Sequence, residues 1–127
     1  MAPDTPTLLE KAQSFLEFHR KVVADFERSL ANARHFINLA GQAVEHEPEN
    51  TVAMIEQIQE IDLLGHLSKQ YEEFQQMAAQ LSTLKVDENR VQASVTSVRE
   101  QYEEILAEAE EQAGIMDVML ASVQYPH

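Results

Sequence analysis

The side chains able to do chemistry are five His and 22 Asp and Glu residues, in a chain of 127 residues that contains no Cys. No His follows a Glu by three residues, so the Glu-x-x-His unit of carboxylate-bridged di-metal bundles is missing. A His-Glu-x-x-His zinc motif, a Gly-x-Ser-x-Gly elbow and a Gly-rich phosphate loop are also missing. Without Cys there is neither a thiolate zinc site nor a cysteine nucleophile. We therefore expect no catalytic residues, no cofactor, no metal site and no enzymatic activity.

The acidic residues outnumber the basic ones and give a formal net charge of −13. This charge disfavours nucleic acid, which binds proteins mainly through Lys and Arg contacts to phosphate, and it disfavours anionic membrane surfaces. The net charge is −1 over residues 1–46, −5 over 47–86 and −7 over 87–127. The Glu residues of the last segment are expected to form a solvated helix face or, alternatively, to bind a basic partner.

The longest regular pattern predicts a first helix over about residues 6–45. Every seventh position of this segment is apolar, at Leu9, Leu16, Val23, Leu30, Ile37 and Val44. Two neighbouring heptad columns are mostly apolar as well, including the one that holds Leu8 and Phe36, and a stripe this wide suits a helix that contacts two other helices. His19 lies in this stripe. We expect it to be partly buried and hydrogen-bonded to a neighbouring helix, so that its protonation in acid would destabilise the fold.

A second helix is predicted over about residues 50–83, beginning near Asn50. Its apolar pattern is regular in the second half, but the first half joins it through two successive steps of three residues near Ile61. Gly65 lies at this irregularity, and a Gly inside a helix costs about 1 kcal/mol relative to Ala. Two interpretations stay open: one continuous, bent helix, or a break near Gly65 that gives four helices. Ile61 and Met77 are expected among the core residues of this segment.

A third helix is predicted over about residues 88–123. Its apolar positions step by four and three from Val91 to Val123, with Gln112 as the one polar member. Three long segments joined by short turns favour antiparallel neighbours. We therefore expect residues 1–127 to form a single all-α domain, an elongated, antiparallel, up-down-up three-helix bundle with coiled-coil-like heptads.

Two large apolar residues of the first helix fall outside its apolar stripe. Phe18 and Leu39 occupy a column that otherwise holds Lys11, Asp25 and Asn32. Single apolar residues at a surface are common, but two on one face of a helix also indicate a surface for a partner. Phe18 and Leu39 are therefore our candidate partner-binding residues.

The sequence predicts a non-enzymatic helical interaction protein, a subunit or adaptor that joins a larger assembly through helix–helix contacts. The expected partners are other helical proteins or further copies of this chain. No basic, apolar leader and no stretch of about 18 apolar residues is found, so we expect no signal peptide, no transmembrane segment and a cytoplasmic location. One alternative is an amphipathic coat protein of a lipid or polymer surface, which resembles the phasins in helical class only. Another is a helical secretion or assembly chaperone.

Overall fold

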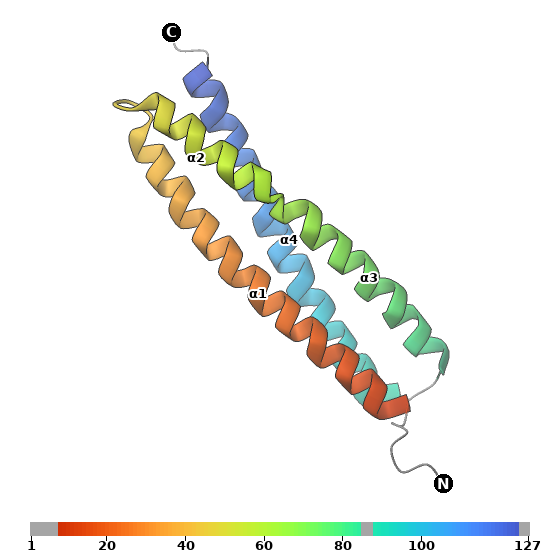
Figure 1. Ribbon diagram of the computed structural model, residues 1–127. Helices are drawn as coiled ribbons and strands as arrows, with labels where there is room; N and C mark the ends of the chain where they lie inside the picture. Colours follow the sequence, from red (N-terminus) through yellow and green to blue (C-terminus); the bar gives the residue numbers. More distant parts are fainter. Residues whose placement is uncertain (1–7, 85–87, 125–127) are drawn as a thin grey trace.

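The computed structural model describes residues 8–84 and 88–124, and within these ranges it contains four helices. They are α1 (Leu8–Ala43), α2 (Pro48–Ile61), α3 (Leu63–Leu84) and α4 (Glu88–Gln124). α2 and α3 follow each other as one bent rod antiparallel to α1, and α4 runs beside both in the direction of α1 (Figure 1). The predicted all-α, up-down-up bundle is therefore confirmed, with its second rod divided in two. Residues 6 and 7 of the predicted first helix lie outside the described residues.

α1 buries two of its three apolar heptad columns. Its buried residues all come from these two columns and are Ala12, Leu16, His19, Val23, Leu30, Ala33, Ile37 and Ala40. The expectation that the third column belongs to the core is wrong at Leu8 and Phe36, which are exposed. The buried columns already fill the space between the three rods, so the third column lies at the edge of the contact with the second rod.

The second rod is broken at Asp62, three residues before the predicted position at Gly65. Asp62 has a left-handed backbone with φ 52°, a conformation that Asp tolerates better than most residues, and this ends α2. Its carboxylate then accepts a hydrogen bond of 3.2 Å from the backbone N–H of Gly65 and so caps α3. A Cβ atom on Gly65 would collide with this carboxylate. Gly65 therefore leaves room for the cap and is not itself the break.

α2 begins two residues earlier than predicted, at Pro48 and not at Asn50. Pro suits the first helical position because an N–H there would have no partner inside the helix, and Glu47 precedes it as the residue that flanks the helix. One turn later, the buried Thr51 hydroxyl donates a hydrogen bond of 2.9 Å to the backbone oxygen of Ala40 in α1. The start of α2 is thus tied directly onto α1.

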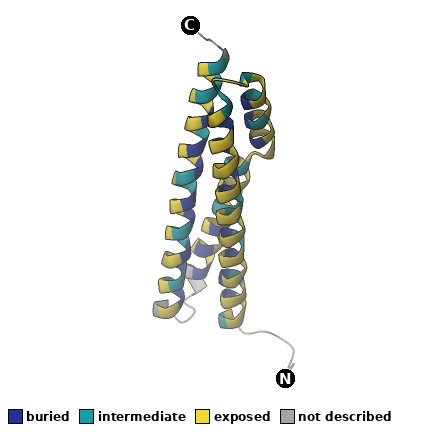
Figure 2. Cartoon of the chain, turned by 90° about the vertical axis from the view of Figure 1, so that its left-hand side faces the viewer, coloured by how far each residue is buried: buried dark blue, intermediate teal, exposed yellow. Residues whose placement is uncertain are grey.

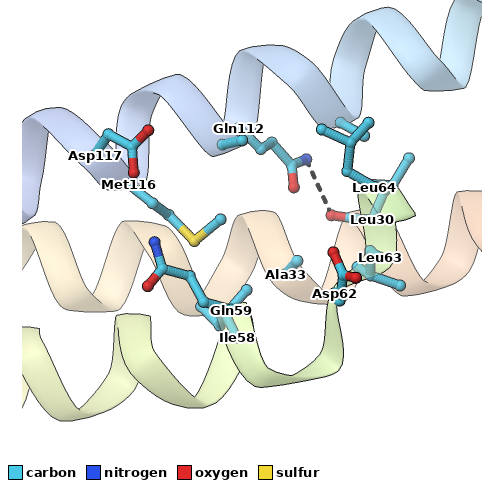
Figure 3. Close-up of a pocket in the computed structure, with 12 residues that line it drawn as sticks. Leu30, Ala33, Ile58, Gln59, Asp62, Leu63, Leu64, Gln112, Met116 and Asp117 are labelled. Atoms are coloured by element: carbon cyan, nitrogen blue, oxygen red, sulfur yellow. Dashed lines mark hydrogen bonds between the residues drawn. The ribbon is translucent and has the colours of Figure 1, made fainter. Parts of the chain in front are cut away.

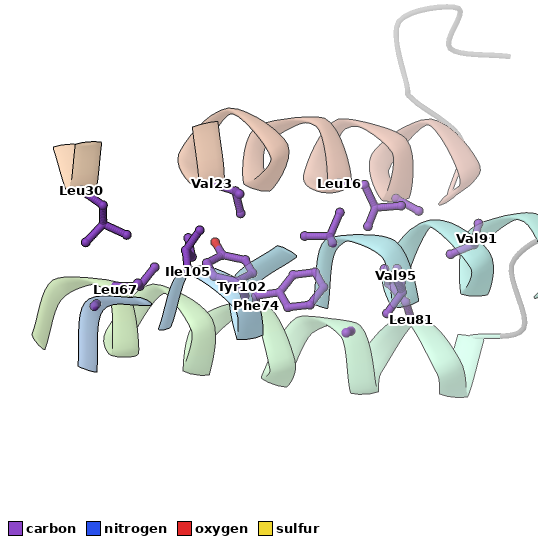
Figure 4. Packing of buried hydrophobic residues seen from close by; sticks show 14 residues of the cluster. Leu16, Val23, Leu30, Leu67, Phe74, Leu81, Val91, Val95, Tyr102 and Ile105 are labelled. Atoms are coloured by element: carbon purple, nitrogen blue, oxygen red, sulfur yellow. The ribbon is translucent and has the colours of Figure 1, made fainter. Parts of the chain in front are cut away.

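The buried apolar side chains form two clusters stacked along the bundle. The aromatic cluster joins the first part of α1 to α3 and to the first part of α4, around Phe74 and Tyr102 (Figure 4). The aliphatic cluster joins the last part of α1 to α2 and to the later part of α4, and its buried members are Ala33, Ile37, Ala40, Ile55, Ile58 and Met116. Met119 packs its side chain over Gly41 beside this second cluster, since a Cβ atom on Gly41 would lie 2.9 Å from Cε of Met119. The break at Asp62 lies between the two clusters.

Candidate functional site

The two candidate partner-binding residues, Phe18 and Leu39, both have exposed side chains on α1. Phe18 is 57% exposed and Leu39 is 37% exposed. Three heptads separate them, so they share one face of the helix and lie roughly 30 Å apart along its axis. The ring of Phe18 meets the ring of His19 edge-on, with 5.1 Å between the centroids, which holds it against the bundle. Phe18 and Leu39 therefore do not contact each other but mark two parts of one long surface.

Four further exposed apolar side chains extend this surface. Leu8 and Phe36 stand on α1 in the next heptad column, Ile61 is the last residue of α2, and Met77 is on α3. We call the six residues the outer apolar face; its members are Leu8, Phe18, Phe36, Leu39, Ile61 and Met77. Figure 2 shows how exposed residues continue along α1 on the side away from the core.

Helical periodicity places Ile61 and Met77 at the edge of the second rod that is nearest α1. Ile61 lies two turns after Met54, which packs against the aliphatic cluster. On α3, Tyr71 faces α4, where its hydroxyl donates a hydrogen bond of 3.0 Å to a Glu carboxylate. Residues three before and three after Phe74 lie on opposite sides of it around the helix, so Met77 is on the side opposite Tyr71. Because Tyr71 faces α4, Met77 lies on the side of α3 that faces α1. The expectation that Ile61 and Met77 belong to the core is wrong, since they are 57% and 42% exposed beyond the edge of the contact with α1.

Two of the six residues of the outer apolar face, Phe18 and Leu39, are predicted by the heptad pattern of the sequence. Met77 could have been recognised because it falls outside the regular steps that connect Phe74, Ala78 and Leu81. Ile61 could have been recognised because it lies at the step of three residues where the pattern loses its regularity. Departures from the heptad pattern therefore indicate which apolar residues are exposed.

Charge is distributed unevenly between α1 and α4. α1 holds five of the nine Lys and Arg residues and four of the 22 acidic residues, whereas α4 holds two and eight. Two Glu residues of α4 already have partners, because Glu103 accepts a hydrogen bond from Tyr71, and Glu108 contacts Gln112 and pairs with Arg34. Binding of a basic partner to the remaining Glu residues stays a prediction. The α1 part of the outer apolar face thus lies on a helix with one more basic than acidic residue, whereas its α2 and α3 part lies on helices with an acidic excess.

Behind Phe18, a buried polar pair links α1 to α4. Nδ1 of His19 lies 2.6 Å from the hydroxyl oxygen of Tyr102, and both side chains are buried. Burial lowers the pKa of His19, although the negative charge of Glu73 opposes this effect, and burial together with Glu73 raises the pKa of Tyr102. Both groups are therefore neutral near pH 7. The prediction that His19 is buried and bonded to a neighbouring helix is confirmed, and the pair is a structural hydrogen bond.

A cavity of about 230 Å³ lies where the second rod is broken (Figure 3). Its apolar wall includes Leu30 and Ala33 of α1, Ile58 of α2 and Met116 of α4. The amide nitrogen of Gln112 donates a hydrogen bond of 3.2 Å to the backbone oxygen of Leu30 at the same level. The cavity is thus lined by all three rods, is partly open to solvent and has one buried polar side chain, Gln112, in its lining.

In residues 8–84 and 88–124, no three His, Asp or Glu side chains come close enough together to hold a metal ion. The helices in this part of the chain are also too short or too polar for any of them to cross a membrane. The features left to explain in the described residues are the outer apolar face, the cavity and a smaller exposed apolar patch of Ile115 and Val118 on α4.

Comparisons of the chain with protein-family models, with curated protein sequences and with solved structures found no match. The function is therefore argued from the geometry of this molecule alone.

Proposed function

We propose that this protein is a non-enzymatic helical subunit or adaptor that joins a larger assembly through helix–helix contacts. The observation that supports the proposal is the outer apolar face, where six large apolar side chains stand exposed on α1, α2 and α3. A partner helix placed along this face would add a fourth rod and bury these side chains in the way that helix-in-groove recognition requires. Aromatic anchors such as Phe18 and Phe36 carry much of the energy of such interfaces.

The charges of α1 and of the second rod indicate which charged residues a partner helix should carry. Lys11 is exposed, stands one heptad before Phe18 in the same column, and makes no ion pair with any described residue. α1 is the helix richest in Lys and Arg, whereas α2 and α3 carry an excess of acidic residues, so acidic residues of a partner are favoured beside α1 and basic ones beside α2 and α3. The partner is thus expected to be an amphipathic helix with charges of both signs beside its apolar stripe.

The test replaces an apolar residue of the outer apolar face by Asp. The control makes the same replacement at an exposed apolar residue on another helix. Phe18→Asp and Leu39→Asp each place a charge on the face, while Val118→Asp places one on α4, where Val118 is 67% exposed. The full chain and its variants are used to capture partners from the native lysate, and the captured proteins are identified by mass spectrometry. We expect Phe18→Asp to weaken binding at least about tenfold, Leu39→Asp to weaken it less, and Val118→Asp to leave it unchanged.

Three measurements separate the proposal from its rivals. Thermal melts by circular dichroism must show that the variants keep the helix content of the parent chain. Mass-resolved size exclusion shows whether the partner is a second copy, in which case Phe18→Asp converts a dimer to a monomer. A monomer that captures nothing would contradict the proposal, as would equal losses for Phe18→Asp and Val118→Asp. Capture of liposomes or hydrophobic particles in place of proteins would favour the coat protein.

A further inference from the structure

The cavity at the broken rod is separate from the outer apolar face and has a different structural origin. Asp62 ends α2 with its left-handed backbone, so no continuous helix passes this level on one side. On the other two sides the chain presents small side chains, Ala33 on α1 and Ala109 and Ala113 on α4. Three Ala residues opposite a helix break leave a space that neither core cluster fills.

The wall of this cavity is apolar, but its mouth is acidic. The lining residues Leu30, Ile58 and Met116 are buried, while Asp62, between α2 and α3, and Asp117, on α4, are exposed lining residues (Figure 3). No Lys, Arg or His is among the residues that line it, all of which are described. A cleft with carboxylates beside low-dielectric walls attracts cations and repels anions.

Hydrogen-bond acceptors are available at the mouth and inside. Asp62 uses Oδ1 to cap α3, which leaves its other carboxylate oxygen to accept a further hydrogen bond. Gln112 is only 6% exposed, and its Nε2 is occupied by the backbone oxygen of Leu30. Its Oε1 takes no part in that bond, and an amide oxygen can only accept. Asp62, Asp117 and Gln112 thus offer acceptors to a ligand that donates, and Gln59, the other amide in the lining, is exposed.

We propose that this cavity binds a small apolar cation, an alkyl or aryl ammonium. Its apolar body occupies the space between Ala33, Ile58 and Met116, and its N–H groups donate to Asp62, Asp117 or Gln112. This site goes beyond the proposed function and does not depend on a partner helix at the outer apolar face. A free amine and the end of a Lys side chain share the required chemistry.

The size of the cavity agrees with such a ligand. An apolar cavity of about 150 Å³ holds benzene, so 230 Å³ has room for a six-membered ring with a short chain. The ammonium would remain at the exposed mouth, where it keeps part of its hydration and avoids the cost of full burial. The ligand would contact α1, α4 and both sides of the break, so it should stabilise the junction between the two core clusters.

The experiment is a titration of the ¹⁵N-labelled full chain, followed by ¹H–¹⁵N NMR, with benzylammonium as the probe. We expect saturable shifts of amides around Ala33, Ala109 and Ala113, with a Kd on the order of 1 mM, as is usual for a ligand of this size. Benzyl alcohol tests the role of the charge and should bind more weakly, and benzoate should not bind. n-Butylammonium, which reproduces the end of a Lys side chain, distinguishes the two sources. Preference for it would assign the site to a Lys of a protein partner, and preference for benzylammonium to a free amine.

Two pairs of variants locate the probe. Asp117→Asn should weaken binding about two- to fivefold, the usual effect of a partly exposed charge pair, while Glu110→Gln, an exposed carboxylate on the same helix outside the cavity, should not. Ala113→Leu fills the mouth and should abolish binding without lowering the melting temperature. Gly114→Ala is its neighbouring control, because an added Cβ atom there meets nothing within 4 Å.

The proposal is overturned if benzylammonium gives no saturable shifts, if benzoate binds as well as benzylammonium, or if Ala113→Leu leaves binding intact. The shifts could instead be confined to amides near the exposed carboxylates of α4 and be reduced equally by Glu110→Gln and Asp117→Asn. This result would show diffuse attraction of the cation to α4 and would also overturn the proposal. Phe18→Asp should not change these shifts, because Phe18 does not line the cavity. A negative titration would therefore overturn the cavity proposal and leave the proposed function untouched, and loss of partner binding in Phe18→Asp would not affect the titration.

Discussion

The aromatic and the aliphatic cluster fill the same bundle with different side chains. In the aromatic cluster rings touch rings, with Phe15 stacked on Phe74 at 5.6 Å between centroids and Tyr71 stacked on Tyr102 at 5.4 Å. The buried members of the aliphatic cluster are Ala, Ile and Met only. Rings fill the space between helices in the aromatic cluster, whereas small and flexible side chains fill it in the aliphatic cluster, as where Met119 packs over Gly41.

The two parts of the second rod also have different main neighbours, and this explains why the rod is broken between the clusters. α2 packs mainly on α1, to which the Thr51 hydroxyl ties it, whereas α3 packs mainly on α4. A straight helix cannot change its main neighbour without tilting as a whole. The left-handed Asp62 lets the rod change direction at one residue, and the cavity is the space left at the change.

The largest expected effect distinguishes the two clusters directly. Phe74→Ala removes a fully buried ring that contacts three other rings, and we expect it to lower the free energy of unfolding by about 3–5 kcal/mol. Met116→Ala should cost less, about 2 kcal/mol, because Met116 already borders a cavity and is slightly exposed. Urea unfolding followed by circular dichroism measures both values. Equal losses would show that the clusters contribute alike.

A smaller effect is expected at the junction, where two Gly→Ala changes should differ. Gly114→Ala meets no atom and should stabilise α4 by about 0.5–1 kcal/mol. Gly65→Ala displaces the Asp62 carboxylate, and the lost cap, worth about 1 kcal/mol, should cancel that gain. In an Asp62→Ala background the cap is already gone, so Gly65→Ala should then stabilise as Gly114→Ala does. If Gly65→Ala does not raise the free energy of unfolding in the Asp62→Ala background, the role of Gly65 is not to leave room for the cap.

The smallest expected effect is a pH dependence confined to the aromatic cluster. His19 has a pKa below its ordinary 6.5 in the fold because it is buried, so the unfolded chain takes up the proton first as pH falls. The stabilisation from neutral His19 is complete above about pH 6.5 and decreases below it until the pH passes the lowered pKa. The effect is small because Glu73 opposes the desolvation.

The matching measurement compares urea midpoints at pH 7.5 and pH 5.5 for the parent chain, His19→Gln and His66→Gln. His66 is exposed, so its replacement should leave the pH dependence as it is. His19→Gln should reduce the loss on acidification. An unchanged loss would assign the pH dependence to the carboxylates.

Much of this fold could be predicted because heptad spacing decides which face of a helix is apolar. It identified the buried columns of α1, the regular steps of α4 and the buried His19. It could not show how far each neighbouring rod reaches around α1, and for this reason Leu8, Phe36, Ile61 and Met77 were expected in the core. A continuous, bent helix and a break near Gly65 both remained open from the sequence, because the cost of a mid-helix Gly does not show that the Asp three residues earlier ends the helix.

The two hydrogen bonds between α1 and α4 have a consequence for the alignment of these parallel helices. Apolar columns that repeat every seven residues look alike after a slide of one heptad, so burial alone hardly opposes such a slide. His19 pairs with Tyr102 at a sequence distance of 83, and Leu30 with Gln112 at 82, so both bonds specify nearly the same offset. Sliding α4 by one heptad would bring Val95 or Ala109 to His19, and Ile105 or Met119 to Leu30. The buried side chains of His19 and Gln112 would then lose their partners on the neighbouring helix, and this cost favours the present alignment over a slid one.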